Sequence, residues 1–196
     1  MINPVSRRKW ATPGAISLLV GTLVASGCIL GGPFPKSWGP LYRGDDLEAR
    51  LAGRYDCSGE LVIPESQYSE YIDLGYFLRG AGCDFVLIET SQEGLLRLTF
   101  HFPERSATKV REFSRGEGYK TSAKWILLEN LADFQTGGIV AAWTSEKAAL
   151  AVNERGDLIV RRVNTDVGLI WIIPAGGKST WWGKFPRLPM AVTDPR

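Results

Sequence analysis

Histidine is almost absent from the sequence, which contains only one, His101, among its 196 residues. A Ser-His-Asp or Cys-His mechanism would have to use this single imidazole, and a structural zinc site takes four Cys or His ligands. His101 follows Phe100 in a segment that we predict to be a strand, and we interpret it as a partly exposed strand residue. The sequence therefore favours a protein without a metal site, a cofactor or a histidine-based active site.

An excess of charge of either sign is also missing, because 23 Lys and Arg residues stand against 21 Asp and Glu residues. The first 27 residues contain three charges, all basic, at Arg7, Arg8 and Lys9, so the rest of the chain carries 20 basic and 21 acidic groups. Nucleic acids bind to clustered basic surfaces. We therefore expect no nucleic-acid partner.

The remaining composition is ordinary for one folded domain, with 44% hydrophobic and 11% aromatic residues. These values exclude a disordered chain and a polytopic membrane protein. From the patterns described below, we divide the sequence into a leader (1–27), a Gly- and Pro-rich tether (28–44) and a single β-rich domain (45–196).

The leader has the layout of an export signal, with basic residues first, then an apolar run from Ala15 to Val24, then small residues. The stretch Leu23-Val24-Ala25-Ser26-Gly27-Cys28 resembles the lipobox of bacterial lipoproteins. The resemblance implies cleavage before Cys28 and acylation of its sulfur and new amino group, and several acyl chains anchor a protein stably in a membrane. Ile29 replaces the Asp that retains many enteric lipoproteins in the inner membrane, so the resemblance implies an outer-membrane lipoprotein facing the periplasm.

Two alternatives to the lipoprotein interpretation remain at this point. Ala25 stands where Leu, Val or Ile is usual in a lipobox, and small residues at Ala25 and Gly27 also fit ordinary signal-peptidase cleavage. The segment from Gly14 to Gly32 is about long enough to span a bilayer as a retained helix.

The number of cysteines fits export to an oxidising compartment. If Cys28 is acylated, Cys57 and Cys83 remain as a pair that can form a disulfide in the periplasm. Such a bridge closes a loop of roughly 27 residues and stabilises the fold by about 3.5 kcal/mol in the chain-entropy model. The alternative is two separate buried thiols.

Alternating strand patterns dominate the chain after one short helix, which we predict from Asp45-Asp46 to Gly53. We expect hairpins around 91–94, 115–118 and 153–157, and we leave 67–79 open between helix and loop. The predicted strands are Arg54 to Ile63, Phe85 to Thr90, Leu95 to Phe102, Lys109 to Ser114, Tyr119 to Glu129, Ile139 to Thr144, Ala148 to Val152, Leu158 to Val163 and Gly168 to Ile173. This pattern predicts a mainly β fold, an antiparallel sandwich or barrel of about eight strands.

Three patterns resemble catalytic motifs without their required context. Ser106 and Lys109 have Ser-x-x-Lys spacing but no helix or partner motifs. The segment 176–180 ends like a phosphate-binding loop, yet Ile172 stands where its first Gly belongs, and we expect a flexible connecting loop there. The acidic pair Asp45-Asp46 and Glu129 are candidate carboxylates for glycoside hydrolysis only in the general sense that any acid is.

The strongest candidate contact residues are Trp181 and Trp182, in a stretch that is rich in tryptophan and lysine. Neighbouring residues of a strand point to opposite faces, so one of these rings is either in the core or exposed as a contact residue. An exposed ring is suited to stack on a sugar, to lie at a membrane interface or to anchor a protein partner. The alternative is that both rings cover the end of the sheet.

These observations favour a lipid-anchored lipoprotein of a Gram-negative cell envelope that acts as a binding module without catalysis. Its partners would be the membrane, through acylated Cys28, and an envelope protein or polysaccharide. One alternative is an envelope enzyme that acts on cell-wall polymer through carboxylates, and another is a periplasmic inhibitor or immunity protein. The sequence leaves the target and the oligomeric state open.

Overall fold

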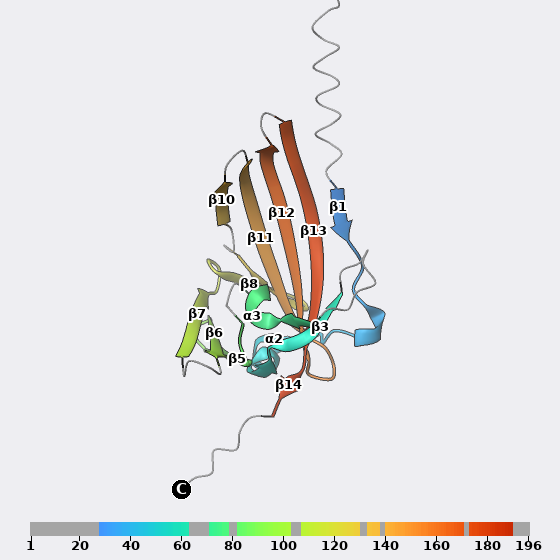
Figure 1. Cartoon of the computed structure of the whole chain (residues 1–196). Coiled ribbons are helices and arrows are strands. Elements are labelled where there is room, and N and C mark those ends of the chain that lie inside the picture. The colour runs from blue at the N-terminus through green and yellow to red at the C-terminus, as the bar shows by residue number, and fades with distance from the viewer. Residues whose placement is uncertain are drawn as a thin grey trace, which may run out of the picture.

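The computed structural model describes residues 28–62, 71–78, 82–102, 107–129, 133–137, 140–170 and 173–189. Its strands form one nine-stranded and one five-stranded sheet (Figure 1), which confirms the predicted mainly β fold. The strand number exceeds the expected eight because several strands are short, such as β4 (Tyr71–Asp73) with three residues and β14 (Arg187–Leu188) with two. No helix in the described ranges is long and apolar enough to cross a membrane.

The nine-stranded sheet has the order β4-β3-β13-β12-β11-β9-β8, with β1 added to β13 and β10 added to β11. Within the described residues β4 and β8 do not pair, so the sheet is open and the barrel alternative does not apply. All its strand pairs are antiparallel except β1 with β13. Its strands are β1 Cys28–Gly31, β3 Ser58–Val62, β4 Tyr71–Asp73, β8 Tyr119–Ser122, β9 Trp125–Leu128, β10 Asp133–Gly137, β11 Val140–Val152, β12 Leu158–Ile170 and β13 Ile173–Phe185.

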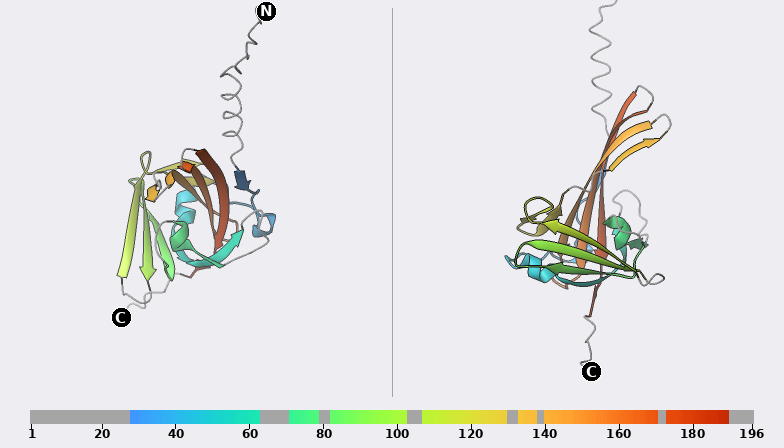
Figure 2. Two further views of the ribbon diagram at one scale, coloured as in Figure 1. Left: turned by 45° about the horizontal axis from the view of Figure 1, so that its top comes forward. Right: turned by 90° about the vertical axis from the view of Figure 1, so that its left-hand side faces the viewer.

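The five-stranded sheet has the order β14-β2-β5-β6-β7 and faces one end of the long strands β11, β12 and β13. Figure 2 shows its strands running across the direction of these long strands, as in a sandwich-like pair of sheets. Its strands are β2 Gly53–Asp56, β5 Phe85–Thr90, β6 Leu95–Phe102, β7 Ala107–Ser114 and β14 Arg187–Leu188. Three short helical segments accompany the sheets, namely η1 Lys36–Trp38, α2 Leu47–Leu51 and α3 Leu74–Phe77.

The main core lies between the two sheets and is closed by α2 and α3. Its apolar side chains come from alternate positions of the strands, as a half-buried sheet face requires. The largest completely buried members are Tyr55, Tyr119, Phe77, Phe100, Phe185, Leu47, Leu51, Leu74, Leu78, Ile88, Leu96 and Leu98.

The other face of the nine-stranded sheet carries a smaller apolar cluster built around the segment that precedes α2. Trp38 is 3% exposed and packs with Ala151, Ile159 and Trp182, while Phe34 borders the cluster. Part of the segment for which we expected a tether therefore lies against the sheet, because its aromatic residues bury apolar surface there.

Several predicted elements match the structure closely. The strands β5 and β6 have the predicted bounds, and α2 lies within the predicted helix. The hairpin that we predicted around 153–157 is present, with Val152 opposite Leu158 in the register of β11 and β12. Both strands are longer than predicted, and the separate strand expected from Ile139 to Thr144 is the first part of β11.

Four predicted elements are wrong. The strand from Arg54 to Ile63 is two strands in different sheets, because Ser58 N–H donates 2.8 Å to the Asp56 carboxylate and turns the chain. The hairpin predicted around 115–118 is wrong, because the turn there carries the chain from β7, which pairs with β6, into the other sheet. The single strand predicted from Tyr119 to Glu129 is also wrong, because it is the two strands β8 and β9, which pair with each other. The segment from Gly168 to Ile173 holds the end of β12 and the start of β13.

Candidate functional site

The predicted disulfide is present between Cys57 and Cys83, whose Cα atoms lie 5.8 Å apart. It ties the junction of β2 and β3 to the residues just before β5, and Asp73 accepts a hydrogen bond of 3.0 Å from Cys83 N–H. Cys57, Asp73 and Cys83 are the one group of metal-ligating side chains that comes together in the described ranges. Both sulfurs are consumed by the disulfide, so this group is a structural crosslink.

Trp181 and Trp182 point to opposite faces of β13, as strand alternation predicts. Trp181 is partly buried and packs against the main core, whereas Trp182 belongs to the smaller cluster on the other face. Trp182 is only 6% exposed, and its indole N–H donates 3.1 Å to the carbonyl of Gly32. Trp182 nevertheless lines a pocket, so it is the member of the pair that can contact a ligand.

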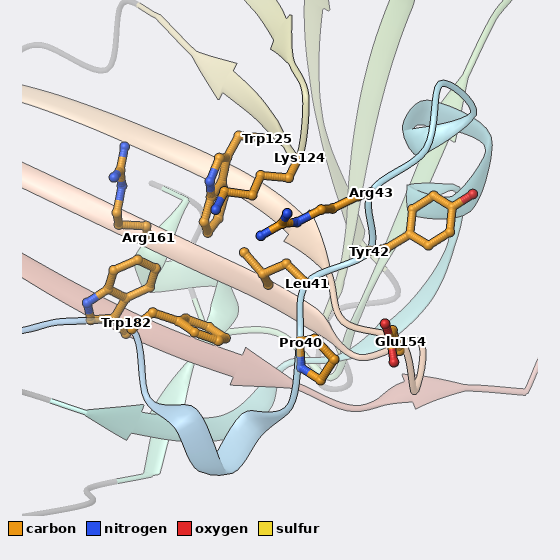
Figure 3. Close-up of a pocket in the computed structure, with 10 residues that line it drawn as sticks. Pro40, Leu41, Tyr42, Arg43, Lys124, Trp125, Glu154, Arg161 and Trp182 are labelled. Atoms are coloured by element: carbon orange, nitrogen blue, oxygen red, sulfur yellow. The ribbon is translucent and has the colours of Figure 1, made fainter.

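This pocket has a volume of about 780 Å³ and opens on the sheet face that carries the smaller cluster (Figure 3). The sheet provides its floor through β9, β12 and β13, and the segment before α2 provides one wall. Its lining residues are Phe34, Pro40, Leu41, Tyr42, Arg43, Lys124, Trp125, Glu154, Arg161 and Trp182. We call it the aromatic–cationic pocket.

Three of the aromatic rings that line the pocket contact one another. The ring of Trp182 lies 5.4 Å from that of Phe34 and 5.9 Å from that of Trp125, between ring centroids. The planes of the two rings are inclined by 69° in the pair with Phe34 and by 48° in the pair with Trp125, and inclined rings make favourable aromatic contacts. These rings therefore form an aromatic cluster in the lining of the pocket.

Three cations surround the rings, against one acid, Glu154. The guanidinium carbon of Arg161 lies 5.5 Å from the ring centre of Trp125 and 5.9 Å from that of Trp182. Within the described residues, no carboxylate forms an ion pair with Arg161, Arg43 or Lys124, and the buried Nε of Arg161 has no hydrogen-bond acceptor. In Figure 3 the Arg43 side chain extends toward Lys124 and Trp125.

Hydrogen bonds hold the pocket wall against the sheet. Asn153, which is 2% exposed, donates 3.0 Å to the carbonyl of Trp38, and Tyr42 N–H donates 2.8 Å to the carbonyl of Val152. The indole N–H of Trp38 donates 3.0 Å to Glu60, which also pairs with Lys184 at 2.8 Å. The wall is thus positioned by specific polar contacts as well as by burial.

Within the described residues, the remaining sequence candidates take part in local contacts and do not come together in a second site. His101 stacks on Phe85 with ring centres 4.2 Å apart, as a structural strand residue does. Glu129 forms an ion pair of 2.8 Å with Lys120, and Asp46 accepts a hydrogen bond from the Tyr42 hydroxyl. Asp45 is exposed next to it.

The two motif-like segments do not form binding loops in the described ranges. Residues 176–180 lie within β13, so the expected connecting loop is wrong at this position, and a strand does not curl around a phosphate. Ser106 lies outside the described residues, and Lys109 is an exposed residue of β7.

Sequence reasoning identified Trp182 but missed its most important neighbours, Trp125 and Arg161. A usable signal exists in β12, where Arg161 follows Ile159 at the alternate spacing and therefore shares its face. Phe34 gave no such signal, because the segment before α2 has no regular period.

Comparisons of the chain with protein-family models, with curated proteins and with solved structures find no match.

Proposed function

We propose that this protein is a lipid-anchored binding module of a bacterial cell envelope, and that its aromatic–cationic pocket binds an anionic ligand with a planar or apolar face. The observation that carries the binding proposal is Arg161, which stacks beside two tryptophans without a carboxylate partner among the described residues. The leader that ends at Cys28 supports the membrane anchor.

The chemistry of the pocket favours an anion over a cation or a neutral molecule. Arg43, Lys124 and Arg161 carry three positive charges against the one negative charge of Glu154. Guanidinium groups bind carboxylates and phosphates through charge-assisted hydrogen bonds, and tryptophan rings contribute stacking and apolar contact. Envelope saccharides with carboxylate groups combine both features, so we propose an acidic glycan as the ligand.

An envelope glycosidase is the weaker alternative, because glycoside hydrolysis normally uses two carboxylates on opposite sides of the bond. The aromatic–cationic pocket contains one, Glu154.

Ligand binding is testable by tryptophan fluorescence, since Trp125 and Trp182 line the pocket. Soluble peptidoglycan fragments, which carry carboxylates next to sugar rings, serve as the probe. We expect them to change the fluorescence of the wild type, and Arg161→Gln to weaken their binding about tenfold or more, because a charged hydrogen bond contributes about 1.5–3 kcal/mol.

The matched control is Arg97→Gln, which changes an exposed arginine that pairs with Glu112 on the other sheet. This variant should bind the fragments as the wild type does. Equal affinity of all three proteins would contradict the proposed pocket function.

The lipid anchor is tested separately in cells. Radiolabelled palmitate should enter the wild type, whereas Cys28→Ser should remain unlabelled and uncleaved. Equal labelling of both chains would contradict the anchor and leave the pocket proposal in place.

A further inference from the structure

The three longest strands extend well beyond the core at one end. Each of β11, β12 and β13 has 13 residues, yet β9 pairs with β11 only at 148–150 and β3 pairs with β13 only at 182–184. At the opposite end the described strands that flank them are the short β10 and β1. Figures 1 and 2 show this end projecting past the five-stranded sheet.

The acylation candidate Cys28 occupies a defined row of this extension. We call a set of residues that pair with one another across neighbouring strands a row. Across β1, β13, β12, β11 and β10, the row of Cys28 consists of Cys28, Gly177, Asp166, Thr144 and Asp133. The row therefore crosses all five strands of the projecting sheet and contains two carboxylates.

Charge disappears from the sheet beyond this row. The four rows toward the tip contain no Asp, Glu, Lys or Arg, and most of their residues are apolar or glycine. These rows are Phe134, Trp143, Val167 and Gly176, then Gln135, Ala142, Gly168 and Ala175, then Thr136, Ala141, Leu169 and Pro174, and finally Gly137, Val140, Ile170 and Ile173.

Charged residues return on the other side of the row of Cys28. Lys178, Glu146 and Lys147 lie in the first three rows toward the core. The boundary between the charged and the uncharged parts of the sheet thus coincides with the residue that we propose to be acylated.

We propose that the four uncharged rows dock into the interface of the membrane that holds the acyl chains of Cys28. This inference rests on the proposed lipid anchor. Acyl chains would fix Cys28 at the membrane surface. Because β1 runs parallel to β13, the β13 residues that precede Gly177, which belong to the four uncharged rows, lie on the N-terminal side of Cys28. Four rows at about 3.3 Å each reach about 13 Å beyond Cys28.

This depth fits the interfacial layer better than the hydrocarbon centre. Edge strands have unpaired backbone groups, which are costly where no water is present, and interfacial elements bury their apolar face about 5–10 Å into the boundary between headgroups and acyl chains. Docking of the tip would fix the orientation of the domain, which flexible acyl chains alone would not.

The experiment uses the full-length, lipidated chain in vesicles of phosphatidylethanolamine and phosphatidylglycerol. Ile170→Cys is labelled with an environment-sensitive fluorophore, since the native cysteines are acylated or disulfide-bonded. Val163→Cys is the matched control, because Val163 also lies on β12, three rows from the row of Cys28 on its charged side. Spin-labelled lipids then report contact with the bilayer.

We expect lipid quenching to remove most of the fluorescence at position 170 and to leave position 163 unchanged. The absence of quenching at both positions would overturn the inference. A blue-shifted probe at 170 that lipids do not quench would indicate a second copy of the chain at the tip and would also overturn it.

Palmitate incorporation into Ile170→Cys distinguishes failure of tip docking from failure of the lipid anchor. Incorporation without quenching overturns tip docking and leaves the anchor in place, whereas no incorporation in any variant overturns the anchor and this inference together. Circular dichroism confirms that both labelled variants keep their β structure.

Discussion

Arg161 and Arg162 are neighbours on β12, but they face opposite sides of the nine-stranded sheet. Arg162 forms an ion pair of 2.7 Å with Glu146, and the two side chains are only 14% and 5% exposed. Arg161 lies on the pocket face between two tryptophans and has no carboxylate partner within the described residues. The same residue type thus forms an ion pair within the fold on one face and lines the pocket on the other.

The largest effect should follow from breaking the ion pair on the core face. We expect Glu146→Gln to lower the free energy of unfolding by about 3–5 kcal/mol, because the largely buried Arg162 charge loses its ion pair with Glu146. Urea unfolding measures the change. The exposed pair of Arg97 and Glu112 provides the control, since Glu112→Gln should cost less than about 1 kcal/mol.

A double change sharpens this prediction. Glu146→Leu combined with Arg162→Met removes both charges and should recover most of the lost stability, because apolar residues of similar size replace buried ion pairs well. No recovery would show that the ion pair is not the cause of the loss.

A second effect on the core face appears at high pH. Tyr55 is completely buried and its hydroxyl donates 2.9 Å to the Leu51 carbonyl, and burial raises the pKa of Tyr55 to about 12. The unfolded chain ionises first, near its usual pKa of about 10, so the contribution to stability is complete below pH 10 and is lost as the pH rises toward 12. One pKa unit corresponds to about 1.4 kcal/mol, so the free energy of unfolding should fall by about 2–3 kcal/mol.

Tyr55→Phe is the control for this pH dependence. It removes the ionisable group and should show a shallower decrease between pH 10 and 12, with a constant offset from the lost hydrogen bond. Parallel stability curves for the two proteins would show that Tyr55 does not cause the decrease.

On the pocket face, Asn153 should have the largest effect on stability. Its amide donates 3.0 Å to both Trp38 and Asp157, and its carbonyl oxygen accepts from the backbone N–H groups of Arg155 and Asp157. Asn153→Ala removes one buried hydrogen bond, to Trp38, and three partly buried ones, and it should cost about 2 kcal/mol.

A change in tryptophan fluorescence should accompany this loss, because Trp38 sits where Asn153 attaches the pocket wall. Glu154→Ala, next to it in the same turn, removes an exposed side chain and should leave both stability and fluorescence almost unchanged. Similar effects of both variants would contradict the role of Asn153.

The two faces also differ in how well the sequence predicts them. The core face follows strand alternation, so β5, β6 and the hairpin of β11 and β12 are predictable from local patterns. The pocket depends on residues far apart in the chain, such as Phe34, Trp125 and Trp182, which only the tertiary fold brings together. Alternation does assign Trp181 and Trp182 to opposite faces, but it does not tell which face holds a pocket.

The errors have a related cause. The sequence marks turns through Gly and Asp, but it does not mark whether the chain continues in the same sheet or crosses to the other one, as it does at Cys57 and at 115–118. The apolar run from Gly168 to Ile173 looks like one strand because both strands that meet there, β12 and β13, lack charge at their ends.

The smallest effect on stability should come from Arg161→Gln. Failure of this prediction would contradict the comparison between the two faces of the sheet most directly. Arg161 contributes contacts with two tryptophan rings, which are worth about 0.5–1 kcal/mol each at partly exposed sites. Arg161→Gln also removes a buried Nε that has no acceptor in the described ranges, which offsets part of that loss. We therefore expect a decrease below about 1 kcal/mol in urea unfolding, against a much larger loss for Glu146→Gln on the opposite face. A loss as large as that of Glu146→Gln would mean that Arg161 supports the fold, and the pocket would lose the residue on which its proposed function depends.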